Sequence, residues 1–212
     1  MKIYLVTKVE RFWHWVNAVG IVLLALSGLN IHFVREFDVF GSLSAAITLH
    51  NIIGIIVSLD YLLWAGYMIS SRRIRFYLPN RDDMPRGLIR QTRYYLWGIF
   101  RGEPHPYAES GSRKFNPLQK WTYLGVMVVL MPIQVASGLS LLYFIENWTR
   151  FRTSIVWDLG VLHTVTAIFL TAFLIAHIYL GSTGETPVEH FKMMFTGYAE
   201  PEASHESEGE RR

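Results

Sequence analysis

The chain has 212 residues, of which 51% are hydrophobic, 15% aromatic and 17% charged. Soluble domains usually carry about 25% charged residues, so this composition argues against a soluble protein and favours one that crosses a membrane. The sequence contains no cysteine, which excludes disulfides, thiolate zinc sites, iron–sulfur clusters and thioether-linked haem. Any redox cofactor is therefore held by histidine, methionine or oxygen ligands.

Four apolar runs are long enough to cross a membrane as helices, which takes about 20 residues each. They lie at about 12–34, 43–69, 118–145 and 155–180. Helices are expected because lipid leaves every backbone amide to be satisfied internally. The N-terminal segment lacks a small-residue cleavage site and the first run is long, so we expect a retained helix and not a signal peptide. The predicted fold class is all-α, a transmembrane four-helix bundle formed by residues 1–190.

The placement of lysine and arginine predicts the orientation of these helices. Lys2, Lys8 and Arg11 precede the first run, and only Arg35 lies between the first two. The segment 70–117 is far more basic. It contains Arg72, Arg73, Arg75, Arg81, Arg86, Arg90, Arg93, Arg101, Arg113 and Lys114. We therefore expect this segment and both termini on the cytoplasmic side of a bacterial or archaeal inner membrane.

Two further segments have distinct compositions. Residues 85–100 (PRGLIRQTRYYLWGIF) mix arginines with aliphatic and aromatic residues, a pattern typical of an amphipathic helix lying on an anionic membrane surface. A plain basic loop is the alternative. Residues 191–212 are expected to form a polar C-terminal tail, because their end, PEASHESEGERR, has the composition of a disordered segment.

His32 lies at the outer end of the first run, and four of the other histidines lie further inside the apolar runs, where ionisable residues are costly and indicate function. His163 and His177 are fourteen residues apart, which is about 40° short of four helical turns and about 21 Å of rise. One helix therefore presents both rings on nearly the same face. Counting depth along each predicted helix places His50 level with His163 and His14 level with His177. The sequence thus predicts two layers of paired imidazoles.

Haem fits such pairs best, because two neutral imidazoles can fill both axial positions of its iron inside an apolar bundle. With no open position on the iron, the expected role is electron transfer. Zinc is disfavoured because it requires four close ligands. The alternatives are that the histidines only pack neighbouring helices, or that they carry protons in a non-redox transporter or structural membrane subunit.

Several stretches resemble the membrane di-haem cytochrome b subunits of thiosulfate reductase, formate dehydrogenase and nickel–iron hydrogenase complexes. The resemblance covers about Val9 to Gly181 and is greatest to the thiosulfate reductase branch. It is carried by RFWHWVNAVGIVLLALSGLNIHF, LHNIIG, KFNPLQKWTYLGV, QVASGLSLLY and LHTVTAIFLTAFLIAHIYL. It implies that His14 and His177 bind a cytoplasmic-side haem b, and His50 and His163 an outer one.

The same resemblance implies a quinone site, for menaquinone or ubiquinone, beside the cytoplasmic-side haem. The matching residues are Asn116, Gln119 and Lys120, which can donate hydrogen bonds to a quinone carbonyl. The alternative is that Asn116 and the proline after it cap and start the third membrane helix. Asp60 is expected either to relay protons or to pair with a neighbouring donor.

These observations predict a membrane-anchoring cytochrome b that passes electrons between the quinone pool and a periplasmic-side redox partner. The partner would be an iron–sulfur or multihaem subunit of an oxidoreductase complex, since this chain has no sequence that binds such a centre. We expect it to contact His32, Phe33 and the loop 146–152. A stand-alone quinol-linked cytochrome that acts on a small oxidant is the redox alternative.

Overall fold

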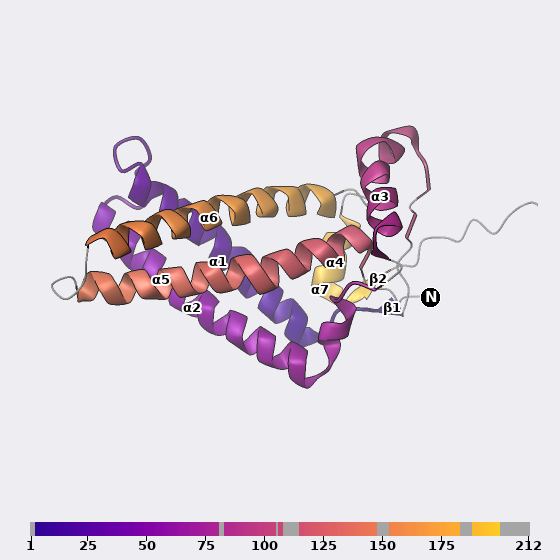
Figure 1. Ribbon diagram of the computed structural model, residues 1–212, viewed down its shortest axis with the longest axis horizontal. Coiled ribbons are helices and arrows are strands. Elements are labelled where there is room, and N and C mark those ends of the chain that lie inside the picture. Colours follow the sequence, from indigo (N-terminus) through magenta and orange to yellow (C-terminus); the bar gives the residue numbers. More distant parts are fainter. Residues whose placement is uncertain are drawn as a thin grey trace, which may run out of the picture.

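The computed structural model describes residues 3–80, 83–104, 106–107, 115–147, 153–182 and 188–199. Long helices dominate it, and short elements gather at one end of the bundle (Figure 1). In chain order these are β1 (Ile3–Tyr4), α1 (Lys8–His32), α2 (Leu43–Ser70), a 3-10 turn (Arg73–Phe76), α3 (Arg86–Arg93), α4 (Pro117–Leu124), α5 (Met131–Glu146), α6 (Thr153–Gly181), α7 (Glu189–Thr196) and β2 (Tyr198–Ala199).

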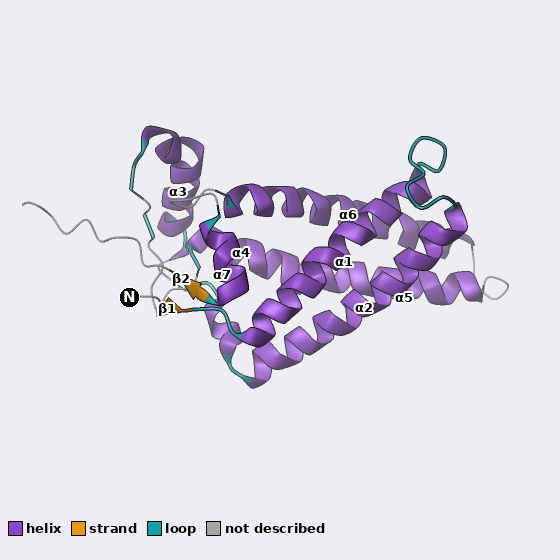
Figure 2. Ribbon diagram, turned by 180° about the vertical axis from the view of Figure 1, so that it is seen from behind, coloured by secondary structure: helices purple, strands orange, loops and turns teal. Residues whose placement is uncertain are grey.

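The part of the chain that the structure describes contains four helices long and apolar enough to cross a membrane. They span Lys8–His32, Leu43–Ser70, Pro117–Ile145 and Ser154–Gly181. They lie alongside one another in both views (Figures 1 and 2). Their outward surfaces are apolar; Leu63 on α2 and Ile175 on α6, for example, are 73% and 66% exposed. Such surfaces suit lipid, and the predicted all-α transmembrane bundle is confirmed.

The start of α1 is tied to the end of α2 by a buried carboxylate. Thr7 and Glu10 form a reciprocal capping box at the start of α1, which satisfies two backbone donors that the helix leaves open. Arg73, just after α2, reaches Glu10 at 3.0 Å and also donates to the Leu5 carbonyl. Burial, together with the nearby Glu10 carboxylate, raises the pKa of Tyr77 above its usual range, so this phenol remains protonated.

The bundle is built from two close helix pairs, α1 with α2 and α5 with α6. In the first pair, a Cβ placed on Gly20 would lie 2.4 Å from Val57 Cγ2, so only glycine permits this approach of the two backbones. The buried apolar cluster that joins the two pairs contains Val57, Trp64, Met68, Val126, Met127, Met131 and Leu170.

The third membrane helix changes its winding before Pro132. Residues Gly125–Leu130 are π-helical, and the Met131 amide bonds the Val126 carbonyl, five residues back. In this winding the Met127 carbonyl would pair with the amide of residue 132, which proline lacks. The Tyr61 hydroxyl of α2 donates to that carbonyl instead, at 2.7 Å. A side chain thus satisfies the acceptor that the proline leaves open.

The segment after α6 packs back onto the start of α1. The Arg11 guanidinium donates to the Phe195 carbonyl, the Trp15 indole donates to the Met194 carbonyl at 3.1 Å, and β2 pairs antiparallel with β1. The polar tail is expected to begin at residue 191, but that residue lies within α7 and the described chain is structured up to residue 199. Residues 200–212 lie outside the described part.

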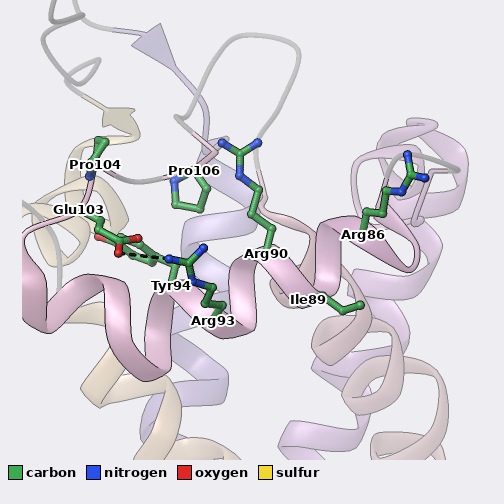
Figure 3. A pocket seen from close by; sticks show the side chains of 8 residues that line it. All are labelled: Arg86, Ile89, Arg90, Arg93, Tyr94, Glu103, Pro104 and Pro106. Atoms are coloured by element: carbon green, nitrogen blue, oxygen red, sulfur yellow. Dashed lines mark hydrogen bonds and ion pairs between the residues drawn. The ribbon is translucent and has the colours of Figure 1, made fainter.

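A helical segment also forms where the amphipathic helix is expected. α3 continues as a π-helical stretch (Tyr94–Gly98) and a 3-10 turn (Ile99–Arg101). A mostly apolar groove on this segment is lined by Leu88, Ile89, Thr92, Arg93, Leu96 and Trp97. An adjoining hollow of about 500 Å³ between α3 and the prolines that follow it is lined by Arg86, Ile89, Arg90, Arg93, Tyr94, Glu103, Pro104 and Pro106 (Figure 3). The two share Ile89 and Arg93, so the segment carries apolar and basic side chains on adjoining faces, a distribution that suits an interfacial helix.

Candidate functional site

The four histidines of the membrane helices meet as two pairs. His14 of α1 lies opposite His177 of α6, with ring centroids 6.2 Å apart. His50 of α2 lies opposite His163 of α6, also with ring centroids 6.2 Å apart. We call the first the proximal pair, because it is nearer the bundle end that holds α3, α7 and the strands, and the second the distal pair. α6 is one unbroken helix and supplies a ring to each.

The spacing within each pair suits one metal ion between two imidazoles. Metal–imidazole bonds are about 2.0–2.1 Å long and each ring centroid lies about 1 Å beyond its nitrogen, so two axial imidazoles have centroids roughly 6 Å apart. Among the described residues, no group of three or more histidine, cysteine or acidic side chains could hold a metal ion. Two donors alone fit an iron whose other four ligands come from a porphyrin.

The helix packing leaves α6 apart from the two helices that complete the pairs. The close backbone approaches of α6 are to α5 and to the π-helical stretch Gly125–Leu130. Within the described part of the chain, the backbone of α6 makes few or no close approaches to α1 and α2. The imidazole pairs therefore cross from one half of the bundle to the other, where a flat cofactor would have to lie.

Serine hydroxyls orient both rings of the distal pair. Ser27 Oγ of α1 is 2.9 Å from His50 Nδ1, and Ser137 Oγ of α5 is 3.0 Å from His163 Nδ1. Each hydroxyl also donates to a backbone carbonyl of its own helix, that of Leu23 or that of Gln134. A serine has one proton to donate, so each Nδ1–H is the donor to serine and each Nε2 keeps its lone pair for a metal.

Glycines next to these serines bring the helix backbones against the rings. A Cβ on Gly28 would lie 3.6 Å from His50 Cε1, and one on Gly138 would lie 3.0 Å from His163 Cε1. The second distance is tighter than ordinary van der Waals contact, so a methyl group at position 138 would make the His163 ring shift by a few tenths of an ångström.

Gln134 occupies the metal-binding side of His163. Its side-chain amide nitrogen is 3.1 Å from His163 Nε2, and its Oε1 is buried with no hydrogen-bond partner among the described residues. A metal on Nε2 would replace this amide contact, and the unpaired oxygen makes the present amide position inexpensive to leave.

Aromatic rings surround the proximal pair. Phe173 stacks on His177 at 5.5 Å and 27°, and Trp15 meets His14 edge-on at 5.3 Å. His14 Nδ1 is buried with no hydrogen-bond partner among the described residues. A buried, unpaired ring nitrogen costs free energy, which a ligand on that nitrogen would recover.

The residues expected at the quinone site lie together, and each has a partner within the protein. Asn116 and Gln119 form a capping box at the start of α4, and Asn116 also donates to the Tyr95 hydroxyl at 3.1 Å. Lys120 forms a buried ion pair with Asp83 at 2.8 Å. The capping alternative is therefore realised, and a quinone would have to compete with these contacts.

Asp60 pairs with a neighbouring donor, which is one of the two roles expected for it. The Asn17 amide of α1 donates to its buried carboxylate, and the same amide nitrogen is 3.2 Å from the Trp13 carbonyl.

At the distal end of the bundle, His32 of α1 contacts the Thr164 hydroxyl of α6 at 3.2 Å, and Phe33 is 52% exposed. Of the loop 146–152 expected to meet a partner, residues 148–152 lie outside the described part.

Sequence reasoning missed the side chains that orient the distal rings and those that hold the quinone candidates. Ser27, Ser137 and Gln134 contact the histidines, while Asp83 and Tyr95 contact Lys120 and Asn116. A signal existed for the serines, because the tripeptide Ser-Gly-Leu occurs at 27–29 and again at 137–139. No comparable signal pointed to Asp83, which is 37 residues from Lys120.

Four apolar helices and two imidazole pairs with haem-like spacing define a membrane b-type cytochrome. Comparison with known proteins agrees: the sequence profile described as "Prokaryotic cytochrome b561" matches residues 5–197, so the chain belongs to the prokaryotic cytochrome b561 family. It is also 36% identical over 200 residues to "Putative cytochrome YdhU" of Escherichia coli (strain K12), covering 93% of this chain and 74% of that protein. The chain is thus a multi-pass bacterial membrane cytochrome that binds haem b and transfers electrons. The expected family resemblance is confirmed, and the non-redox alternatives are set aside.

Proposed function

We propose that the protein holds two b haems, one at each imidazole pair, and passes electrons across the membrane between the quinone pool and a periplasmic-side redox partner. The observation that carries this proposal is the equal 6.2 Å spacing of two pairs that share α6. Fourteen residues of unbroken helix separate His163 from His177, which is about 21 Å of rise. Two centres at that spacing suit a conduit through most of a hydrocarbon core of about 30 Å.

In this proposal the histidines and the helices around them have separate tasks. His14 with His177, and His50 with His163, hold the cofactor, and the apolar side chains of the four helices exclude water from it. Bound haem supplies an iron that takes up and gives back one electron. Two imidazoles for each haem would leave the iron no position for a substrate, so substrate chemistry would belong to an iron–sulfur or multihaem partner subunit.

We further propose that quinone exchanges electrons at the proximal pair. A quinol gives up two electrons and two protons, so its site needs polar groups near the membrane edge. Asn116, Gln119 and Lys120 cluster at the start of α4 with Tyr95 and Asp83. A quinone, menaquinone or ubiquinone, would take a donor from one of these contacts. The Asn116 amide is the best placed, because its partner Tyr95 is itself a hydroxyl donor.

The membrane orientation follows from charge. The basic segment around α3 and both termini are assigned to the cytoplasmic side, so the distal pair is the outer one. A partner would then meet the distal end near His32 and Phe33. The apolar groove and the arginines of α3 would lie against anionic lipid on the opposite side.

Haem counting in ligand variants tests the proposal. The purified chain should contain two haems per polypeptide. His50→Ala and His163→Ala should each remove one centre, and His14→Ala and His177→Ala the other, by reduced-minus-oxidised spectra and redox titration. His32→Ala is the matched control and should retain both. A single haem in the wild-type chain, or loss of the same centre from His14 and His50 variants, would refute the two-site assignment.

Partner dependence is tested separately. Quinol added to the purified chain should reduce its haems without sustained turnover of a small oxidant, because the partner supplies the substrate site. Sustained turnover by the isolated chain would support the stand-alone cytochrome instead.

A further inference from the structure

We infer that Ser27 and Ser137 are positioning residues that fix the distal histidines and lower the reduction potential of the haem bound there. The inference rests on the proposed placement of a haem at the distal pair. It concerns the two Ser-Gly-Leu tripeptides, at 27–29 on α1 and at 137–139 on α5. Neither serine is a haem ligand; each acts through a histidine.

The two tripeptides perform the same task on opposite sides of the site. Ser27 hydrogen-bonds the ring from α2 and Ser137 the ring from α6, at 2.9 and 3.0 Å. The adjacent glycine lies against the same ring in each case. Each half of the bundle, α1 with α2 and α5 with α6, thus contributes one histidine and one Ser-Gly clamp.

The direction of each hydrogen bond follows from the serine's other contact. Ser27 Oγ is 2.7 Å from the Leu23 carbonyl and Ser137 Oγ is 3.1 Å from the Gln134 carbonyl. Carbonyls only accept, so each hydroxyl proton is committed to its own helix. The hydroxyl lone pair then receives Nδ1–H, which fixes the tautomer that leaves Nε2 for the iron.

This hydrogen bond changes the ligand as well as holding it. An imidazole that donates Nδ1–H to an acceptor is a more basic ligand. A more basic ligand stabilises the oxidised iron and so lowers its reduction potential. At the proximal pair, by contrast, His14 Nδ1 has no hydrogen-bond partner among the described residues. The serines therefore make the two centres chemically different although their histidine spacing is the same.

Serine-to-alanine variants of the full chain in membranes test the inference. Ser27→Ala and Ser137→Ala should retain two haems and raise the midpoint potential of the distal one, with a larger rise in the double variant. The proximal midpoint should not move. Ser58→Ala is the matched control, because the hydroxyl of this buried serine of α2 donates to a carbonyl of its own helix, that of Gly54 at 2.7 Å, and contacts no histidine among the described residues.

An unchanged distal midpoint with full haem content would overturn the inference, and so would an equal shift of both midpoints. If an alanine variant loses the distal haem, Ser27→Thr and Ser137→Thr decide, because threonine keeps the hydroxyl. Recovery of the haem at the wild-type midpoint supports the inference, and loss in both threonine variants contradicts it. The haem count of the wild-type chain separately tests the proposed function, so the two failures can be told apart.

Discussion

At the distal pair, two serines hydrogen-bond the imidazoles and two glycines bring the helix backbones close to the same rings. At the proximal pair, Phe173 and Trp15 pack against the rings. Both pairs nevertheless have ring centroids 6.2 Å apart. α6 supplies one histidine to each pair, but the supporting side chains differ: the serines come from α1 and α5, whereas Phe173 lies on α6 itself and Trp15 on α1. One spacing is reached through polar support at one depth and aromatic support at the other.

The two ends of the bundle also differ in charge. The ion pairs that the described residues form, Arg73 with Glu10, Arg93 with Glu103 and Lys120 with Asp83, lie at the proximal end or on the segment that begins with α3. The distal end is held by neutral hydrogen bonds, such as those from the Val39 and Phe40 amides to Asn30. A perturbation should therefore affect one layer before the other.

The largest effect is expected from breaking the buried ion pair. Lys120 and Asp83 are 7% and 1% exposed, and Lys120→Met removes one member of this buried ion pair, a change that typically costs about 3–5 kcal/mol. The proximal haem should be lost at a lower temperature while the distal haem persists, as followed by the absorbance of each centre on heating.

The double variant, Lys120→Met with Asp83→Asn, is the control, because it removes both charges and should recover most of the stability. It also separates structure from chemistry: a stable double variant that no longer reacts with quinol would assign the Lys120–Asp83 pair to the quinone site. Equal loss of both haems in the single variant would contradict the independence of the two layers.

A smaller effect is expected when a methyl group is added to the glycine that lies against the His163 ring of the distal pair. Gly138→Ala places a methyl group 3.0 Å from His163 Cε1, and such overpacking costs about 1–3 kcal/mol. Haem affinity at the distal pair should fall roughly 5- to 150-fold, since 1.4 kcal/mol is tenfold. Titration of the haem-depleted protein with haem measures this.

Gly28→Ala provides the graded comparison, because its added methyl would meet His50 at an ordinary contact distance of 3.6 Å. It should bind haem nearly as the wild type does. If Gly28→Ala were the more damaging of the two, the close approach at Gly138 would not be what positions the distal ring.

How far these features could be predicted from the sequence depends on the distance over which each is determined. The membrane helices and the two layers follow from local properties: apolar run length, and the fourteen-residue separation on α6 that puts His163 and His177 on one face. The serines could not be assigned in the same way. A serine inside a membrane helix commonly bonds a carbonyl of its own turn, as Ser58 does here. Whether its lone pair also meets a histidine depends on how two helices are rotated against each other.

The proximal end shows the same limit. The start of α4 was predictable as a cap because Asn, Pro and Gln in that order are local signals. The pairing of Lys120 with Asp83 was not, since it joins residues on either side of a long loop. The docking of α7 onto Arg11 and Trp15 was hidden for the same reason: the composition after residue 190 suggests a polar tail, and only the packed start of α1 makes it a structured element.

A moderate effect is expected at the aromatic support of the proximal pair. Phe173→Leu removes the ring stacked on His177 at 5.5 Å, an interaction worth about 0.5–1.5 kcal/mol beyond area burial. The proximal haem should remain bound but be lost at a slightly lower temperature. Phe169→Leu is the control, because this ring on the same helix is 59% exposed. A change in the distal haem alone would contradict the assignment of Phe173 to the proximal layer.

The smallest effect is expected at the arginines of α3, which distinguish the two membrane faces. Arg86 and Arg90 line the hollow beside the prolines, whereas Arg93 also pairs with Glu103 at 3.5 Å (Figure 3). An arginine near an anionic membrane surface contributes about 1 kcal/mol. Arg86→Gln and Arg90→Gln should therefore each reduce the phosphatidylglycerol that the purified protein retains, as measured by native mass spectrometry, without altering either haem.

Arg93→Gln should have less influence on lipid retention, because the Glu103 carboxylate already offsets its charge. The expected ranking of the three variants would place α3 at a lipid surface. If α3 were exposed only to water, the protein would retain the same amount of lipid in all three variants. A helix docked on a protein partner would lose that partner instead, and the proximal end of the bundle would then be the side on which the complex assembles.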